Sequence, residues 1–334
     1  MRQKSKLHIV YELAVLLLTV LLLFAVLFQL GYRLTPERMT YGSVWSSYLQ
    51  EEEQSVDVLF MGSSRVYCNV SPARIFEKCG VTSYVMAGPS QTVSLTYYYL
   101  RECLKTQSPR YVFVELSGAY YRQYEEHSLA NVVFMPGLVN RVKAAMTCER
   151  GIIAHALYPL QDFHYLVYEP DEAPELEGTL LCGYTPMLQS RPQTERTFCN
   201  PEVRPGDERY LKNLDWLRKI AALCEENGIT CVFYLAPTMR PFTDEESERL
   251  FSDLNALPCA AAEDWGDLIE EIGIDNEADW YDTIHFNHSG AIKFSDYLAD
   301  YLISLGASPT PDADVPLWTE RIKYLCPLMV EPAK

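Results

Sequence analysis

Two short stretches, far apart in the chain, contain side chains suited to nucleophilic catalysis. Gly62-Ser63-Ser64-Arg65 follows an apolar run that reads as a strand, and Asp282-Thr283-Ile284-His285 precedes an expected helix. A serine after a strand of a parallel sheet exposes its hydroxyl. A histidine held by a carboxylate can take the proton of this hydroxyl and return it later. Taken singly, each stretch also fits a plainer interpretation, a turn of small residues in one case and the N-terminal cap of a helix in the other.

The elements that must position these stretches alternate between strand and helix. Short apolar runs ending in glycine or proline predict strands, and amphipathic segments between them predict crossover helices. This order is typical of an α/β fold with a parallel sheet and right-handed connections. The expected strands are 56–62, 83–88, 111–116 and 229–237, and the expected helices are 71–80, 93–105, 208–227, 244–254, 261–272 and 289–305.

The sequence divides into four parts. Residues 1–33 form a cytoplasmic tip and membrane anchor, and 34–56 form a membrane-proximal connector. We expect residues 57–306 to form the domain that carries both stretches, with a long insertion at about 117–207 that is rich in proline and tyrosine. A loop of this length in a compact domain is usually functional, so we expect it to border the cleft. We expect the tail, 307–334, to pack back onto the domain.

Together, the two stretches resemble the SGNH (GDSL-type) hydrolase family. The order is a Gly-Ser-Ser block after the first strand, Gly88 after the second strand, and an Asp-x-x-His block before the last helix. The resemblance covers roughly residues 57–305 and implies a flavodoxin-like three-layer α/β/α sandwich. It also implies that Ser64 is the nucleophile, that Asp282 and His285 complete a triad, and that the N–H groups of Ser64 and Gly88 form an oxyanion hole.

The chain departs from the family pattern at two positions. Ser63 stands where an aspartate is common, and the stretch after the third strand, Glu115-Leu116-Ser117-Gly118, lacks the asparagine that supplies the third oxyanion donor. Gln91 and Ser117 are the alternatives for that donor. Removing one such donor typically costs about 10²–10³ in rate. A weak enzyme, or one active only in a complex, is consistent with this loss.

The Gly-Ser-Ser block and the N-terminal anchor are similar to those of membrane-anchored SGNH-like proteins of the bacterial cell envelope. These include the D-alanyl-lipoteichoic acid transfer and polysaccharide O-acetylation types. The resemblance implies an acyl transferase or esterase acting on O-acetyl or alanyl groups of an envelope glycopolymer, beside a membrane-bound O-acyltransferase. A non-catalytic partner of that acyltransferase is the alternative. No cofactor is expected.

A metal-dependent hydrolase is a third hypothesis. Asp282, His285 and His288 are spaced so that they could share a metal ion. No further ligand cluster and no Cys-x-x-Cys pair accompanies them. We therefore expect no metal, and His288 is interpreted as the start of the last helix.

The N-terminal segment predicts a membrane anchor. Residues 13–30 are apolar apart from Thr19 and Gln29, and about 20 such residues cross a hydrocarbon layer roughly 30 Å thick. No small-x-small cleavage site follows, which favours an uncleaved anchor over a signal peptide. Arg2, Lys4 and Lys6 precede the helix, so we expect a cytoplasmic N-terminus and an extracytoplasmic domain.

The charge of the remaining chain limits its partners. Outside the anchor there are 24 basic and 44 acidic residues, a net charge of −20. Such a surface repels nucleic acid, so no nucleic-acid partner is expected. The ten cysteines permit disulfides in an exported protein, but Cys224 and Cys231 lie in apolar patterns typical of buried thiols.

Overall fold

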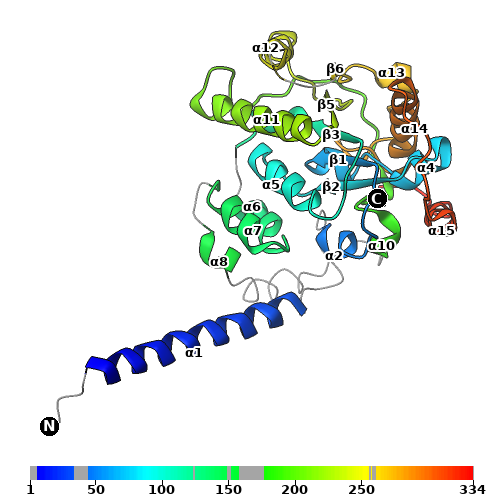
Figure 1. The fold of residues 1–334 in the computed structure, drawn as a ribbon. Coiled ribbons are helices and arrows are strands. Elements are labelled where there is room, and N and C mark those ends of the chain that lie inside the picture. Colours follow the sequence, from blue (N-terminus) through cyan, green and yellow to red (C-terminus); the bar gives the residue numbers. More distant parts are fainter. Residues whose placement is uncertain are drawn as a thin grey trace.

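The chain folds into an α/β domain preceded by one long helix (Figure 1). The structure, a computed structural model, describes residues 6–33, 44–122, 125–148, 152–157, 177–255, 257 and 261–333. Five strands form a parallel sheet in the order β2-β1-β3-β5-β6. The predicted α/β class and parallel sheet are thus confirmed. The strands are β1 Val58–Gly62, β2 Ser83–Ala87, β3 Tyr111–Glu115, β5 Thr230–Leu235 and β6 Ala261–Asp264.

The strand order places a topological switch between β1 and β3. From β1 the chain passes to β2 on one side and then returns to β3 on the other. Ligands of doubly wound sheets bind at such a point, outside the carboxyl ends of the strands. The residues after Gly62 and Glu115 therefore occupy the favoured position for a site.

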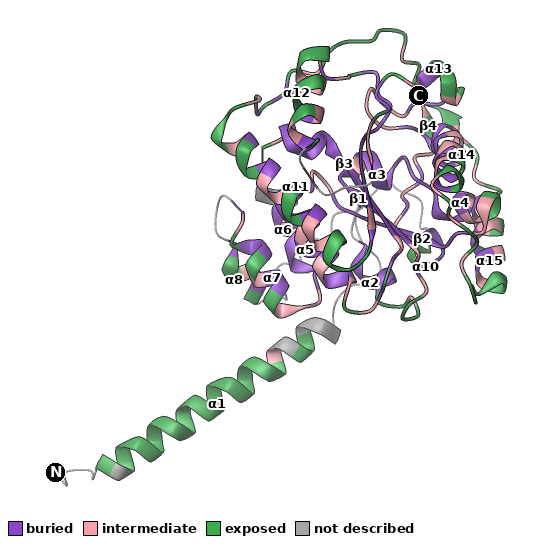
Figure 2. Cartoon of the chain, turned by 45° about the horizontal axis from the view of Figure 1, so that its top comes forward, coloured by how far each residue is buried: buried purple, intermediate pink, exposed green. Residues whose placement is uncertain are grey.

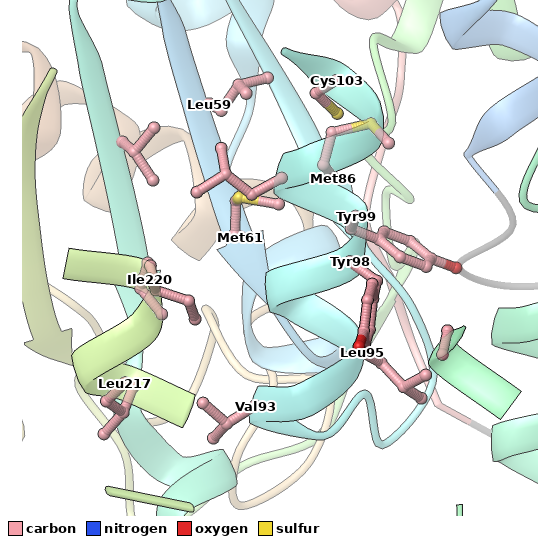
Figure 3. Packing of buried hydrophobic residues seen from close by; sticks show 14 of the residues in the cluster. Leu59, Met61, Met86, Val93, Leu95, Tyr98, Tyr99, Cys103, Leu217 and Ile220 are labelled. Carbon is pink, nitrogen blue, oxygen red and sulfur yellow. The ribbon is translucent and has the colours of Figure 1, made fainter. Parts of the chain in front are cut away.

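Successive residues of each strand enter two separate apolar cores, because side chains of a strand alternate between the faces of the sheet. Leu59 and Met61 of β1 join the core on one face, and Val58 and Phe60 join the core on the other. Figure 3 shows the first core, where Leu59, Met61 and Met86 of the sheet pack against the labelled residues of the covering helices.

Helices cover both faces of the sheet and make three layers (Figure 1). On one face lie α5 Val93–Cys103 and α11 Glu208–Glu226, and on the other lie α4 Pro72–Cys79 and α14 His288–Ser304. A capping box formed by Thr243 and Glu246 begins α12 Asp244–Leu254.

The prediction of a helix over residues 261–272 is wrong in its first part. Residues 261–264 form β6, which pairs with β5 in the register Val232↔Ala261, and only α13 Ile269–Ile272 is helical. Alanine and glutamate favour helices, but the unpaired edge of β5 offers backbone partners to this segment. Tertiary pairing outweighs local propensity here.

The segment expected to be a connector, 34–56, is partly built into the domain. Helix α2 Trp45–Tyr48 is buried, and the ring of Trp45 packs edge-on against Tyr99 of α5 at 4.8 Å. Glu51 makes a buried ion pair with Arg321 of α15 Val315–Leu325, at 2.5 Å. Helix α15 of the tail therefore contacts the domain and holds the residues after α2.

The described residues of the insertion expected at 117–207 are mostly helical as far as Leu157 and mostly irregular after Leu181. The insertion contains η1 Leu116–Tyr120, α6 Glu125–Val133, α7 Leu138–Ala145, α8 Ile153–Leu157 and α10 Gly178–Leu181. Strand β4 Gln189–Ser190 pairs with β7 Glu331–Pro332 of the tail. Residues 123–124, 149–151 and 158–176 of the insertion lie outside the described part of the chain.

Apart from Leu27, the side chains of helix α1 Lys6–Arg33 whose burial is described are exposed, in contrast to the domain (Figure 2). Its segment His8–Leu27 is long and apolar enough to span a membrane. The chain thus has one N-terminal candidate span, where the sequence predicts an anchor.

No disulfide joins cysteines within the described ranges, and Cys259 lies outside those ranges. Most of them are buried, including Cys224 and Cys231. These two thiols fill apolar space, as the sequence predicts.

Candidate active site

A sharp turn at Gly62 sets the position of Ser64. Gly62 has φ +150°, and a Cβ at this position would lie 2.8 Å from Val66 and 3.0 Å from Cβ of Glu115. Only glycine fits this backbone, which turns the chain from β1 into the short helix α3 Ser64–Tyr67. Ser63 is the N-cap residue and is buried, whereas Ser64 is the first helical residue and is partly exposed.

A hydrogen-bonded turn carries Asp282 and His285. The backbone N–H of Tyr281 donates to the carbonyl of His285 at 3.0 Å, and Trp280 and Phe286 form an antiparallel bridge that closes the turn. The N–H of Met239, just after β5, donates to the carbonyl of Thr283 at 3.0 Å. The turn is therefore fixed to the carboxyl edge of the sheet.

The start of α14 holds the other end of this turn. The side chain of Asn287 accepts a hydrogen bond from the N–H of Gly290 at 3.2 Å and so caps the helix. A Cβ on Gly290 would lie 2.4 Å from the carbonyl of Asp279. This glycine lets α14 begin directly against the turn.

Ser64, His285 and Asp282 form a continuous hydrogen-bonded relay. The distance from Ser64 Oγ to His285 Nε2 is 2.8 Å, and the distance from His285 Nδ1 to Asp282 Oδ2 is also 2.8 Å. The two halves of this contact are 221 residues apart in the chain. The structure thus brings together the three residues that the sequence assigned to catalysis, in the arrangement of a serine nucleophile, its base and an orienting acid.

The environment of Asp282 favours its charged form. Burial alone would raise the pKa of this carboxyl, but hydrogen bonds to His285 and from the backbone N–H groups of Ile284 and His285 lower it overall. A carboxylate that accepts several such bonds is stabilised as the anion. Asp282 is therefore suited to hold the His285 ring and to stabilise its protonated form.

Gly88 lies beside Gly62, because Ala87 and Gly62 are register partners in β2 and β1. The N–H of Gly88 makes a long hydrogen bond to the carbonyl of Gly62, at 3.4 Å. The side chain of Gln91 folds back toward Gly88, where its Oε1 would lie 3.2 Å from a Cβ on the glycine. Its Nε2 donates to Thr96 at 2.9 Å.

Ser117, the other candidate for a third oxyanion donor, faces away from this role. Both its backbone N–H and its hydroxyl donate to the carboxylate of Glu115, at 3.1 and 2.5 Å. The residue is fully buried. With both donors used, Ser117 serves to hold Glu115 at the end of β3, and Gln91 is the remaining alternative of the two.

Asn131 of α6 is a residue of this site that the sequence did not indicate. Its side-chain amide lies directly against Gly88, where Oδ1 would be 1.8 Å from a Cβ on the glycine. Its Nδ2 donates to the carbonyl of Pro89 at 2.9 Å. No motif links Asn131 to Gly88, because the insertion brings it there only through folding.

Arg65 is a buried cation next to Ser64. Its guanidinium donates to the hydroxyl of Tyr121 at 2.9 Å, and the nearby carboxyl of Glu115 contributes to the raised pKa of Arg65 despite its burial. Arg65 also lines a small cavity at the carboxyl ends of β5 and β6, together with Leu235, Phe242 and Asp264. Ser64 and His285 are not among the residues that line this cavity.

His288 points away from the relay. Its Nδ1 is hydrogen-bonded to the hydroxyl of Tyr184 at 2.9 Å, and burial lowers its pKa. Within the described ranges, no group of three or more His, Cys, Asp or Glu side chains is arranged to hold a metal ion. The shared site of Asp282, His285 and His288 considered from the sequence is therefore not formed, since His288 packs inside the fold as the first residue of α14.

The arrangement can activate a hydroxyl nucleophile, because His285 lies within hydrogen-bond reach of Ser64 and is itself oriented by Asp282. Acyl transfer through a covalent serine intermediate is the chemistry that such a relay serves. No model of a known protein family matches this chain, and no curated protein matches its sequence.

Proposed function

We propose that the protein is a membrane-anchored serine acyl transferase or esterase of the SGNH type. The relay Ser64–His285–Asp282, with two hydrogen bonds of 2.8 Å, is the observation that carries this proposal. The parallel sheet with its switch point next to Ser64 is the setting in which the SGNH resemblance expects such a relay.

In the first step, Ser64 Oγ attacks the carbonyl carbon of an acyl ester while its proton passes to His285 Nε2. The bond to the leaving alcohol then breaks, and His285 returns the proton to that alcohol, which leaves an acyl-Ser64 ester. In the second step, His285 removes a proton from an incoming hydroxyl, whose oxygen attacks the acyl carbon. The bond from that carbon to Ser64 Oγ then breaks, and His285 returns the proton to Oγ. A sugar hydroxyl as acceptor gives transfer, and water gives hydrolysis.

The oxyanion formed in both steps needs hydrogen-bond donors. The N–H of Ser64 is the first of a helix, where no intrahelical partner exists. The N–H of Gly88 is held only by a long bond to Gly62, and an oxyanion is a stronger acceptor than that carbonyl. The side-chain amides of Gln91 and Asn131 lie against Gly88 with their oxygens, while their nitrogens donate to Thr96 and to the carbonyl of Pro89, so either amide would have to turn over to supply the third donor.

The anchor suggests where the reaction takes place. With α1 spanning a membrane and its basic N-terminal residues on the cytoplasmic side, the domain would lie outside the cytoplasm. An acyl group passed through the membrane by an O-acyltransferase would reach such a domain directly. We therefore propose an envelope glycopolymer as the acceptor or substrate, with O-acetyl or alanyl as the acyl group.

A non-catalytic role beside the same acyltransferase is the second candidate. It is favoured by the state of the groups that could bind an oxyanion. Ser117 donates both its hydrogen bonds to Glu115, and the N–H of Gly88 already donates to the carbonyl of Gly62. In this case the domain would bind and position the polymer without forming an acyl-serine.

Labelling of the full chain in detergent with a fluorophosphonate tests the catalytic proposal. We expect Ser64 to be labelled, Ser64→Ala to abolish labelling, and Ser63→Ala to retain it, because Ser63 makes no side-chain capping bond. Equal labelling of wild type and Ser64→Ala would overturn the acyl-serine mechanism. If Ser64→Ala folds normally, stays in its complex and still abolishes glycan modification, the non-catalytic role is excluded.

A further inference from the structure

Helix α7 exposes apolar side chains on its outward side, where Val139 and the C-cap residue Met146 are 65% and 66% exposed. Its inward side combines two buried alanines with Asn140 and Arg141, which are buried and hydrogen-bonded. Asn140 donates to the carboxylate of Glu102 at 2.7 Å. A surface helix normally places its apolar stripe inward, so this outward face needs an explanation.

Helix α8 continues the same face. It packs against α7, and Arg141 Nε donates to the carbonyl of Ala156 at 2.6 Å, which fixes one helix on the other. The exposed residues of α8 Ile153–Leu157 are again apolar, and Figure 2 shows exposed stretches on both helices. We define the α7–α8 face by its exposed residues, Val139, Lys143, Met146, Ile153, Ala154 and Leu157.

The charge of the α7–α8 face differs from that of the domain. The described residues 138–148 and 152–157 contain no aspartate or glutamate, although the chain outside the anchor carries −20. The only charged side chain on the face is Lys143, which stands between Val139 and Met146 on one side of α7. A lysine among exposed apolar residues can extend its ammonium toward headgroups while its stem covers apolar surface.

The face also lies at the end of the domain that the anchor reaches. Helices α2 and α7 both pack on α5, and in Figures 1 and 2 α2, α7 and α8 lie at the end of the domain nearest α1. Only ten residues, 34–43, separate the end of α1 from Val44. Fully extended, they span at most about 35 Å, so this end of the domain cannot move far from the membrane surface.

We propose that the α7–α8 face seats in the headgroup region of the lipid bilayer that α1 spans. This inference rests on the membrane anchor of the proposed function, and it adds a second attachment that fixes how the domain is oriented. Because α7 packs on α6, whose Asn131 lies against Gly88, the seated face would also hold the candidate active site in one orientation to the bilayer.

Tryptophan quenching in lipid vesicles tests this orientation. The full chain would be reconstituted in phosphatidylcholine–phosphatidylglycerol vesicles whose acyl chains are brominated near the headgroup. We expect the bromine atoms to quench the additional tryptophan fluorescence of the Met146→Trp variant. We expect the fluorescence added by Met329→Trp to be retained, because Met329 is 77% exposed and follows Leu328, which packs on the α14 side of the sheet.

A second substitution separates seating from chance contact. Adding Val139→Glu to Met146→Trp should relieve the quenching, because a carboxylate in the middle of the face opposes its burial among lipids, and the exposed position leaves the fold intact. If the chain floats with the vesicles and Met146→Trp is not quenched, the face does not bind lipid, although the anchor stands. A partner protein would then be its occupant. If the chain does not float with the vesicles, the anchor and this inference both fail.

Discussion

Asn69 Oδ1 accepts a hydrogen bond from the backbone N–H of Phe286 at 2.9 Å. Asn69 follows the short helix that begins at Ser64, and Phe286 directly follows His285, so this bond joins the two halves of the relay across 217 residues. Both residues are fully buried. The hydrogen bond between Asn69 and Phe286 therefore aligns Ser64 with His285 from the buried side of the site, where water does not compete for the bond.

We predict that Asn69→Leu lowers the rate of fluorophosphonate labelling at Ser64 by about 10–100-fold, because a displacement of an ångström at reacting atoms has an effect of this size. Ser295→Ala is the matched control, since Ser295 Oγ accepts from the N–H of Ser71 in the same buried region without touching the relay. Both variants should lower the melting temperature. An equal loss of labelling rate per folded molecule in both would show that Asn69 acts only through stability.

Gly62→Ala should destabilise the fold far more than Gly306→Ala. Both glycines have positive φ, at +150° and +84°, but an added Cβ meets Val66 and Glu115 at position 62 and meets nothing within 4 Å at position 306. We expect a loss of about 2–5 kcal/mol for Gly62→Ala, from backbone strain and overpacking together, and about 1–2 kcal/mol for Gly306→Ala. Chemical unfolding in detergent measures both, and similar losses would contradict the steric account.

Arg321→Met should cost about 3–5 kcal/mol of unfolding free energy, because it leaves the carboxylate of Glu51 buried without its partner. The two side chains are only 4% and 7% exposed. The exposed pair Lys212–Glu208 is the control, and Lys212→Met should leave stability unchanged. Adding Glu51→Leu to Arg321→Met should restore part of the loss. No recovery in this double variant would mean that packing, rather than the lone charge, sets the cost.

The contribution of Asp282 to stability should depend on pH in a defined direction. The pKa of Asp282 is lowered in the folded chain, so its carboxylate stabilises the fold above the ordinary aspartate pKa of about 4, and this contribution is lost as pH falls through the lowered value. Wild type should therefore melt at a higher temperature than Asp282→Asn at neutral pH, and the two should converge in acid. A constant difference down to pH 3 would contradict this assignment.

The strands and the crossover helices could be predicted because their signals are local. Apolar runs ending at Gly62 and Gly88, and a helix ending before Gly228, follow from backbone rules that need no distant partner. The first part of the segment 261–272 could not be predicted, because its strand exists only where it pairs with β5. Local propensity and tertiary pairing disagree there, and pairing prevails.

The three residues of the relay could be named from sequence because each follows or precedes a recognisable element. The residues around them could not: Asn69 and Asn131 carry no motif, and their roles come from contacts with residues distant in the chain. Arg65 belongs to the Gly-Ser-Ser-Arg stretch, but its contact with Tyr121 is likewise set by folding. Ser117 shows that a suggestive position in the sequence can also mislead. Its position after β3 made it a candidate donor, but a hydrogen bond to Glu115, two residues away, uses its hydroxyl.

The sequence by itself determined the apolar N-terminal helix and the α/β class, because these depend on composition and on spacing along the chain, and the family resemblance singled out Ser64, Asp282 and His285. Only the tertiary structure decided that Ser64 Oγ lies 2.8 Å from His285 Nε2, that Ser117 faces Glu115, and that α7 turns an apolar side outward. The physical reason is that hydrogen-bond geometry and burial are set by packing between distant segments, which no local pattern specifies.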